Sequence, residues 1–354
     1  MKLITTKKED VYCGIDFHKV TSTLCTKDRD GNLVEPITTI KTAMLVRHLS
    51  NKKGWIIGIE ATGGLNHVVA ELKKYDHKVI IINSNKFRGI GIGGKKTDTR
   101  DATALCDVLR VGFAPEVYHR CLYARQIKSL LTTREHLVQA RVDGMNHIRG
   151  TLREYGITMP AGAEKFYGIA REKIEELENG LIRNSLLLVF ENILKFREQE
   201  KSVEEGAKLL TVNDERVKRL MTIPGVGILT SLMMIGVIDD ISRFTSAKEF
   251  ASYLGLVPSV HASANMRMMG SITRSGCEML RRYLIHGARS WMRYSPKSDS
   301  NRIWAERVKE RRGMNKATVA LAHRMARISF AILRDESVYK NSKKKPSSTA
   351  LAAA

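Results

Sequence analysis

Four carboxylates in the first third of the sequence are placed so that they could hold a metal ion together. Asp16 ends a short β-rich run, and Glu60 ends a continuous apolar run. Asp98 and Asp101 lie three residues apart at the expected start of a helix, so they share one helical face. Strand ends are where open α/β sheets bind ligands, and converging acids repel one another unless a cation lies between them. This set is typical of Mg²⁺-dependent phosphoryl transfer, in which hard cations hold the attacking and leaving oxygens.

Each of these acids also has an ordinary alternative role. Acids that follow strands often cap helices, and Asp98 is itself a candidate N-cap. The interpretation as a metal site therefore depends on the four residues together and not on any single one.

A serine-rich segment in the last third of the sequence is the second candidate for chemistry. We expect residues 255–284 to form a loop that leads into an arginine-rich helix. Its serines are Ser259, Ser263, Ser271 and Ser275, and we expect its arginines to bind nucleic acid: Arg267, Arg274, Arg281 and Arg282. A serine hydroxyl close to arginines and to a metal-bound phosphate could attack DNA as a covalent nucleophile. The residue pattern alone does not single out one serine, and it leaves open whether His261 acts as a general base.

The segment TIPGVG at 222–227 resembles a helix-hairpin-helix element. Gly225 and Gly227 would let backbone N–H groups approach a phosphate without obstruction by a side chain. The alternative is a simple turn between two packed helices.

A sheet is needed to position the acids. The pattern predicts strands at 11–17, 20–27, 33–40, 55–60 and 78–83, with helices at 42–52 and 65–75. The turn signal Asp30-Gly31-Asn32 joins the second and third runs as a hairpin, while the continuous apolar runs suit strands buried on both faces. This order predicts an α/β domain with a mixed sheet. The stretch GIGIGG at 89–94 matches a dinucleotide fingerprint only weakly, and we expect a flexible loop there.

The rest of the chain is expected to be mostly helical. Glu, Lys, Arg and Leu dominate from 124 to 215, and a break at 156–162 predicts two long helices that form an antiparallel arm. The imperfect heptads leave open whether this arm is a plain helical subdomain or a coiled coil for dimerisation or RNA contact. Amphipathic, arginine-rich helices are predicted at 277–293 and 316–334. The predicted domains are 1–120, 121–215 and 216–340, followed by a disordered tail at 341–354.

The sequence carries a large excess of positive charge. Its 354 residues include 59 Lys and Arg against 37 Asp and Glu, for a net charge of +22, and residues 267–345 hold 20 basic and 6 acidic residues. Because the basic residues are spread over several segments, nucleic acid is favoured as partner over a membrane surface.

The sequence has no run of 18 apolar residues and no secretory signal. Five scattered cysteines lack zinc or disulfide spacing. We therefore expect no membrane partner and a cytoplasmic location.

Three motifs make the chain resemble the DEDD-type insertion-sequence transposases related to the Piv DNA invertase. They are GID at 14–16, IEATGG at 59–64 and KTDTRDA at 96–102. The resemblance covers residues 11–335. It implies a Holliday-junction-resolvase-like (RNase H-like) fold for the N-terminal domain, and it implies that the four acids above bind Mg²⁺.

The C-terminal part resembles the transposase domain of the same family. There GLVP is followed by a serine and then by a helix with the pattern T-x-x-G-x-x-x-LRR. The matching serine is Ser263, five residues after Pro258. Family members often have Ser-Gly at this point, whereas this chain has Ser263-Ala264. The resemblance implies that Ser263 attacks a DNA phosphate to form a phosphoserine link while the acids position Mg²⁺ on that phosphate.

The resemblance also implies partners. Relatives are guided by a structured bridge RNA that pairs with donor and target DNA, and they act as homo-oligomers (dimers or tetramers) in bacterial or archaeal cells, associated with the nucleoid. One subunit's acids are implied to work with another subunit's serine. Two alternatives stay open: a metal-dependent, structure-specific DNA nuclease with water as nucleophile, and a non-catalytic nucleic-acid-binding protein. DNA retained on the denatured protein would argue against the first, and Mg²⁺-dependent activity lost in Asp16→Asn against the second.

Overall fold

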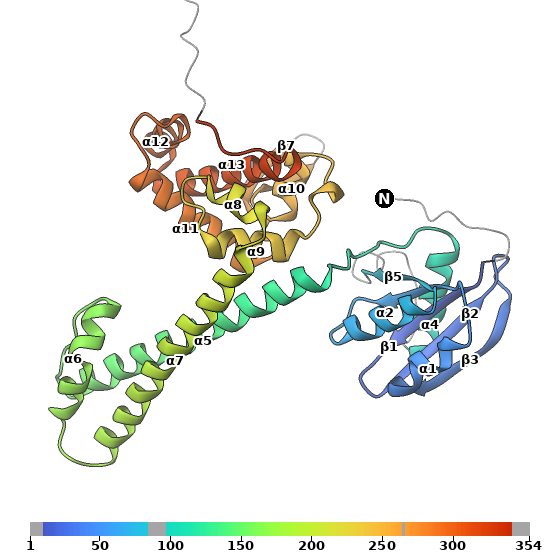
Figure 1. The fold of residues 1–354 in the computed structure, drawn as a ribbon, viewed down its shortest axis with the longest axis horizontal. Helices are drawn as coiled ribbons and strands as arrows, with labels where there is room; N and C mark the ends of the chain where they lie inside the picture. Colours follow the sequence, from blue (N-terminus) through green and yellow to red (C-terminus); the bar gives the residue numbers. More distant parts are fainter. Residues whose placement is uncertain (1–9, 84–96, 264–265, 342–354) are drawn as a thin grey trace, which may run out of the picture. The chain divides into compact units, whose positions relative to one another are not determined.

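A five-stranded mixed sheet forms the centre of residues 1–119, the first of two units in the computed structural model (Figure 1). The structure describes residues 10–83, 97–263 and 266–341, so the predicted loop at 89–94 and the predicted tail, from 342 on, lie outside the described residues. The strand order is β3-β2-β1-β4-β5. The strands are β1 (Tyr12–Phe17), β2 (Thr21–Lys27), β3 (Leu33–Lys41), β4 (Ile56–Glu60) and β5 (Lys78–Ile82). Strands β1 to β3 pair antiparallel and β1, β4 and β5 pair parallel, which confirms the predicted mixed sheet.

Helices cover both faces of this sheet. On one face α1 (Leu45–Ser50), which follows a short 3₁₀ turn at Thr42–Met44, and α2 (Leu65–Lys74) pack against alternate strand residues such as Ile15. On the other face α4 (Asp98–Arg110) packs against the residues between them, such as Tyr12. Side chains alternate along a strand, so odd-numbered residues of β1 such as Ile15 face α1 and α2, and even-numbered residues such as Tyr12 face α4.

The helix α4 lies very close to the sheet because glycines face it. Gly14 and Gly58 are register partners on β1 and β4. A Cβ on Gly14 would lie 2.2 Å from the carbonyl oxygen of Ala102, and a Cβ on Gly58 would lie 2.5 Å from Cδ1 of Leu109. Glycine is the residue that permits such a close approach, so the glycine of the GID motif sets the distance between α4 and β1.

Residues 120–354 form the second unit, which begins with a helical arm. Helices α5 (Leu122–Glu154) and α7 (Leu181–Thr211) lie side by side (Figure 1). Arg134 pairs with Glu200 and Glu204, whereas Gly144 lies against Ile193, so the two helices run in opposite directions. The antiparallel pairing was predicted, but the helix count was wrong. A third helix, α6 (Ala163–Glu175), lies between them in sequence, because a second break at 176–180 separates it from α7.

The remainder of this unit shares one apolar core, to which α9 (Ile228–Ile238) contributes with nine of its eleven residues buried. The other elements are α8 (Glu215–Met221), a 3₁₀ turn (Ile241–Arg243), α10 (Ala247–Tyr253), α11 (Glu278–Tyr294), α12 (Ser300–Arg312) and α13 (Met314–Arg334). The helices predicted at 277–293 and 316–334 are confirmed, and α12 was missed. Among the described residues, no helix combines the length and apolar character needed to cross a membrane.

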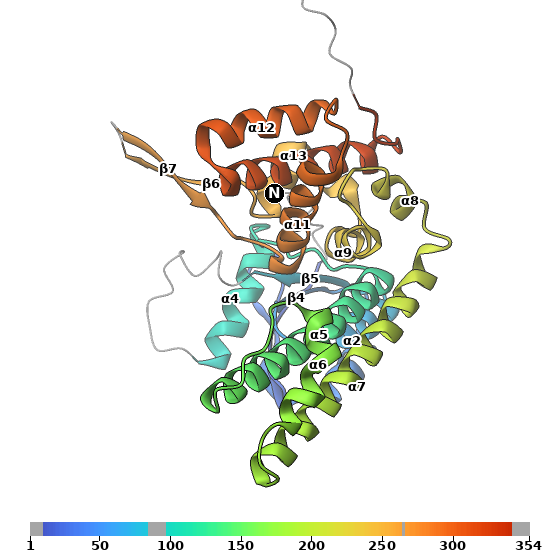
Figure 2. The same cartoon turned by 90° about the vertical axis from the view of Figure 1, so that its left-hand side faces the viewer.

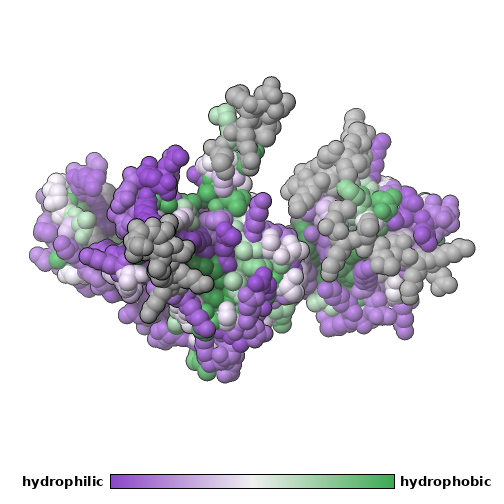
Figure 3. Space-filling model, turned by 90° about the horizontal axis from the view of Figure 1, so that it is seen from above, coloured by the Kyte–Doolittle hydropathy of each residue, from purple (hydrophilic) through white to green (hydrophobic). Residues whose placement is uncertain are grey.

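The serine-rich segment is a β-hairpin, so the prediction of a loop was wrong. Strands β6 (Pro258–Ser263) and β7 (Met266–Ile272) pair antiparallel, and Figure 2 shows them extending away from the helices of their unit. Alternating polar and apolar residues such as Val260 and Met268, both exposed, suit a two-stranded ribbon more than a loop. The surface seen in Figure 3 is mostly hydrophilic, as expected from the high content of charged residues.

Candidate metal centre

Asp16 and Glu60 lie at the same edge of the sheet. Ile15 pairs with Ile59 in the parallel ladder of β1 and β4, so the two acids are the next residues along neighbouring strands. Alternation places both on the sheet face that α4 covers. Asp16 is only 3% exposed, whereas Glu60 is half-buried. The parallel register therefore brings together two acids that are 44 positions apart in the sequence.

The first turn of α4 brings two more acids to this face. Asp98 is the first residue of the helix, and Asp101 lies in the same turn. Thr97 is the N-cap, and its hydroxyl accepts a hydrogen bond from the Arg100 backbone N–H, so the alternative that Asp98 caps the helix is wrong. Carboxylates are stabilised in the first turn by the helix dipole, so this end of α4 suits two acids.

Electrostatics connect α4 with β1. Burial raises the pKa of Asp16, and the negative charges of Asp101 and Asp98 raise it further, while His18 lowers it. The two acids of α4 thus lie close enough to Asp16 to disfavour its ionised form. A divalent cation among these oxygens would remove that cost, and hard oxygen donors are what such a cation prefers.

A residue that the sequence analysis missed completes this cluster. Nε2 of His18 lies 3.2 Å from Oδ2 of Asp16 and 3.9 Å from Oδ1 of Asp98. One ligand atom from each of these three residues lies within 4.8 Å of the other two. The sequence GIDFHK could have indicated His18, because residues two apart at a strand end, here Asp16 and His18, project to the same side. The convergence of all four acids on one ion stays a prediction.

The predicted nucleophile belongs to the second unit. Ser263 is the last residue of β6 and pairs with Met266 across the end of the hairpin. The side chains of Ser263, His261 and Arg267 lie outside the described part of the structure. The backbone therefore places Ser263 at the far end of the hairpin, and its catalytic role stays a prediction.

The arginines proposed to bind nucleic acid have different surroundings. Arg281 is 7% exposed, and its guanidinium donates hydrogen bonds to the backbone carbonyls of Leu254 and Ser275. Arg282 forms an ion pair with Glu135 of α5. Arg274 is exposed and has a φ of +56° just before α11. The geometry gives Arg281 a structural role, whereas Arg274 remains accessible to a phosphate.

The two glycines of TIPGVG also differ. Gly225 has a φ of +80°, and a Cβ there would lie 2.1 Å from the carbonyl oxygen of Gly287 in α11. Gly225 is therefore required for packing against α11. Gly227 precedes α9 as its N-cap and is exposed, with no atom within 4 Å of its Cβ position. The segment does lie between two helices, as predicted, and its contact with phosphate stays a prediction.

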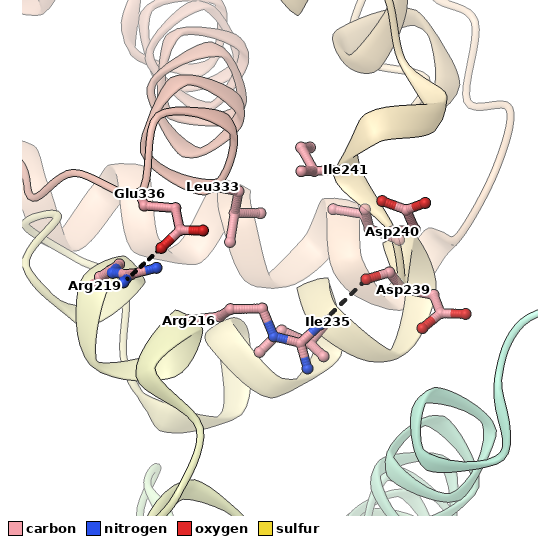
Figure 4. A pocket seen from close by; sticks show the side chains of 9 residues that line it. Arg216, Arg219, Ile235, Asp239, Asp240, Ile241, Leu333 and Glu336 are labelled. Carbon is pink, nitrogen blue, oxygen red and sulfur yellow. Dashed lines mark hydrogen bonds and ion pairs between the residues drawn. The ribbon is translucent and has the colours of Figure 1, made fainter.

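A separate cavity of about 200 Å³ lies between α8, α9 and the end of α13 (Figure 4). Arg219 pairs with Glu336 across it at 2.9 Å, and Arg216 donates to the carbonyl oxygen of Asp239 at 3.2 Å. Both arginines are thus engaged by acceptors of the protein itself, and the lining contains none of the predicted site residues.

Comparisons with known proteins match two separate ranges of the chain. A family model of the DEDD transposase domain of the IS110 type matches residues 13–157, and the model described as transposase IS116/IS110/IS902 family matches residues 217–302. The first range contains the four acids and His18, and the second contains Ser263.

Individual relatives match over most of the chain. The transposase for insertion sequence element IS1111A from Coxiella burnetii is 31% identical over 331 residues, which cover 92% of this chain and 90% of that protein. The transposase for insertion sequence element IS1328 from Yersinia enterocolitica is 26% identical over 92% of this chain and 97% of its own length. The pilin gene-inverting protein of Moraxella lacunata is 36% identical over a shorter region, 34% of this chain and 37% of that protein.

Proposed function

The chain belongs to the IS116/IS110/IS902 family of insertion-sequence transposases, and from this premise we propose that it recombines DNA through a serine nucleophile under the guidance of an RNA. It is a DNA transposase. The DEDD domain implies an RNase H-like fold for its N-terminal part and a dependence on a divalent metal. The guide RNA, the serine step and the choice of Mg²⁺ are the parts that we propose.

The observation that carries the proposal is the approach of the α4 acids to Asp16. Asp16 is buried and fixed on β1, and Asp98 and Asp101 are held on a helix whose distance from β1 is set by Gly14. Glu60 follows the neighbouring parallel strand. We propose that these four acids hold Mg²⁺. When bound, the cation would supply charge stabilisation for the phosphate under attack.

The proposed nucleophile is Ser263. A serine hydroxyl is weak at neutral pH and needs a base or a cation on the phosphate. Attack by its Oγ on the scissile phosphorus forms the phosphoserine bond and releases a deoxyribose hydroxyl, so no water is consumed and religation can reverse the step. Ser263 belongs to one unit and the acids to the other. We propose a homo-oligomer, dimer or tetramer, in which different subunits can supply the serine and the acids.

The proposed partners are donor DNA, target DNA and a structured bridge RNA. The positive charge concentrated in 267–345 supports this part of the proposal, because a protein that holds RNA and two DNA segments must neutralise many phosphates. In the helical arm, the coiled-coil character and the contact with RNA belong to the proposal as well.

The test of the serine step traps the covalent link. The full-length protein is incubated with end-labelled donor DNA, the RNA that co-purifies with it, and Mg²⁺, and is then denatured. Label should stay on the wild type and on Ser259→Ala, which changes a serine of the same strand, and should be lost from Ser263→Ala. Cleavage without retained label would instead support a nuclease that uses water.

Sequencing the co-purified RNA tests the proposed guide, because an RNA unrelated to both DNA substrates would contradict guidance by that RNA.

The test of subunit sharing mixes two inactive variants. Ser263→Ala and Asp101→Asn should each be inactive alone, and the mixed assembly should recover part of the cleavage. A mixture that stays inactive while each variant still assembles with wild type would contradict a shared site.

A further inference from the structure

The backbone of His18 is held at the sheet edge beside Asp16. His18 lies in the short turn between β1 and β2, and its backbone N–H donates to the carbonyl oxygen of Thr21 at 3.1 Å. Its carbonyl oxygen accepts a hydrogen bond from Oγ1 of Thr42 at 2.7 Å, and the Thr42 N–H donates to Val20 at 2.9 Å. Three hydrogen bonds therefore hold the backbone of the turn, so that the sheet sets the position at which the His18 side chain begins.

The ring lies between two carboxylates that come from different elements. Its Nε2 atom is 3.2 Å from Asp16 on β1 and 3.9 Å from Asp98 on α4. The Asp16 side chain is 4% exposed, whereas those of His18 and Asp98 are 53% and 60% exposed. Asp16 therefore forms the buried side of the cluster. His18 and Asp98 form its open side, where a cation and a phosphate have access.

The spacing of these atoms suits coordination. Ligand bonds of about 2.1 Å place neighbouring ligand atoms of a metal ion about 3 Å apart. Of the two distances, 3.2 Å already matches this separation and 3.9 Å needs only a small movement of the exposed Asp98 side chain. The same nitrogen thus faces carboxylate oxygens from two different elements, which is the arrangement that ligands of one shared cation need.

We propose that Nε2 of His18 is a ligand of the divalent cation, together with one oxygen each from Asp16 and Asp98. The inference rests on the proposed metal site and adds a nitrogen donor to its carboxylates. A nitrogen ligand favours Mn²⁺, Co²⁺ and Ni²⁺ relative to Mg²⁺, because imidazole is a softer donor than carboxylate. His18 thereby shifts the metal preference of the site away from that of an all-oxygen cage.

The test detects the nitrogen directly on the full-length protein without nucleic acid. Mn²⁺ is added, and electron spin echo envelope modulation measures nitrogen coupled to the bound ion. We expect nitrogen coupling in the wild type and its loss in His18→Ala. The matched control is His48→Ala, because His48 is an exposed histidine of α1 on the opposite sheet face, and it should keep the coupling. His18→Asp should still bind Mn²⁺ but without coupled nitrogen.

Metal titration by calorimetry gives a second readout. His18→Ala should lose at least about tenfold in affinity for Co²⁺ and less for Mg²⁺. Bound Mn²⁺ without nitrogen coupling in the wild type, or coupling that persists in His18→Ala, would overturn the assignment of His18 while leaving the acid site intact. Unchanged Mn²⁺ binding by Asp16→Asn would instead overturn the proposed metal site itself. Thermal melts of each metal-free variant establish that it folds.

Discussion

Gly14 lies so close to Ala102 that a Cβ on the glycine would be 2.2 Å from the alanine carbonyl oxygen. This contact joins β1, which carries Asp16, to α4, which carries Asp98 and Asp101. The sulfur of Cys106, one turn further along α4, also donates to the carbonyl oxygen of Tyr12 at 3.2 Å. The backbone of α4 thus packs directly against β1, and this packing sets the separation between Asp16 and the two acids of α4.

Gly14→Ala should therefore weaken both the fold and the metal site. The added methyl group meets backbone atoms that cannot rotate away, so α4 must shift, at a cost of about 1–3 kcal/mol in unfolding free energy. The acids of α4 then move away from Asp16, and Mn²⁺ affinity falls. Thermal melts and calorimetric titration measure the two effects. Gly63→Ala is the control, because no atom lies within 4 Å of its Cβ position, and it should change neither quantity.

Asp98→Asn should greatly reduce stabilisation by the metal while the metal-free protein folds normally. The Asp98 side chain is 60% exposed, so neutralising it costs little stability and removes one metal ligand. Saturating Mn²⁺ should raise the melting temperature of the wild type, because a ligand that binds only the folded state stabilises it, and it should raise that of Asp98→Asn much less. DNA cleavage should fall at least about 100-fold. An equal Mn²⁺-induced shift in both proteins would contradict a role for Asp98.

The pH dependence of stability should report the ion pair of Asp214 with Arg216. Burial raises the pKa of Asp214, but the hydrogen bond and the positive charge of Arg216, at 2.8 Å, outweigh burial and leave the pKa below its ordinary value. A carboxyl with a lowered pKa in the folded state stabilises the fold above its ordinary pKa, and this contribution is lost as pH falls through the folded value.

Asp214→Asn should therefore be less stable than the wild type at pH 7, by about 1–2 kcal/mol, and the difference should shrink as pH falls below 4. Asparagine is also a good N-cap, so the capping of α8 by this residue is retained and the charge is tested. Urea unfolding at several pH values gives the difference. A difference in unfolding free energy between the two proteins that stays constant down to pH 3 would contradict the ion-pair explanation.

Arg281 and Arg289 should behave differently on substitution, although both belong to the basic helix α11. Arg281→Ala leaves the buried carbonyl oxygen of Leu254 and the part-buried one of Ser275 without their donor, so it should cost about 1–3 kcal/mol in stability. Arg289 is exposed, so Arg289→Ala should leave stability unchanged and weaken binding to duplex DNA.

The measurement for this pair is the dependence of affinity on salt. Each lost phosphate contact should reduce the slope of log K against log salt by about 0.9. Fluorescence anisotropy at several salt concentrations should show this reduction for Arg289→Ala. An unchanged slope would mean that this face of α11 does not contact the DNA backbone, and an unchanged unfolding midpoint of Arg281→Ala would contradict its structural role.

The sequence was sufficient for features that depend on local pattern. The sequence pattern placed the five strands within one residue at every end. Apolar runs mark the buried strands, and the turn signal at Asp30-Gly31-Asn32 marks the hairpin that leads to β3. The i and i+3 spacing of Asp98 and Asp101 placed both in the first turn of α4. The motifs around the acids were also sufficient to identify the family.

Tertiary structure alone decided what depends on distant partners. His18 joins the acids because the turn after β1 is held by Thr42, and Arg281 is buried where it donates hydrogen bonds to the carbonyl oxygens of Leu254 and Ser275. The hairpin at Pro258–Ile272 was missed because no continuous apolar run marks its strands in the sequence, and α6 because its break lies in a polar segment. These features depend on contacts between residues that are distant in sequence, or on backbone hydrogen bonds. The spacing of side chains along one element encodes neither kind of interaction.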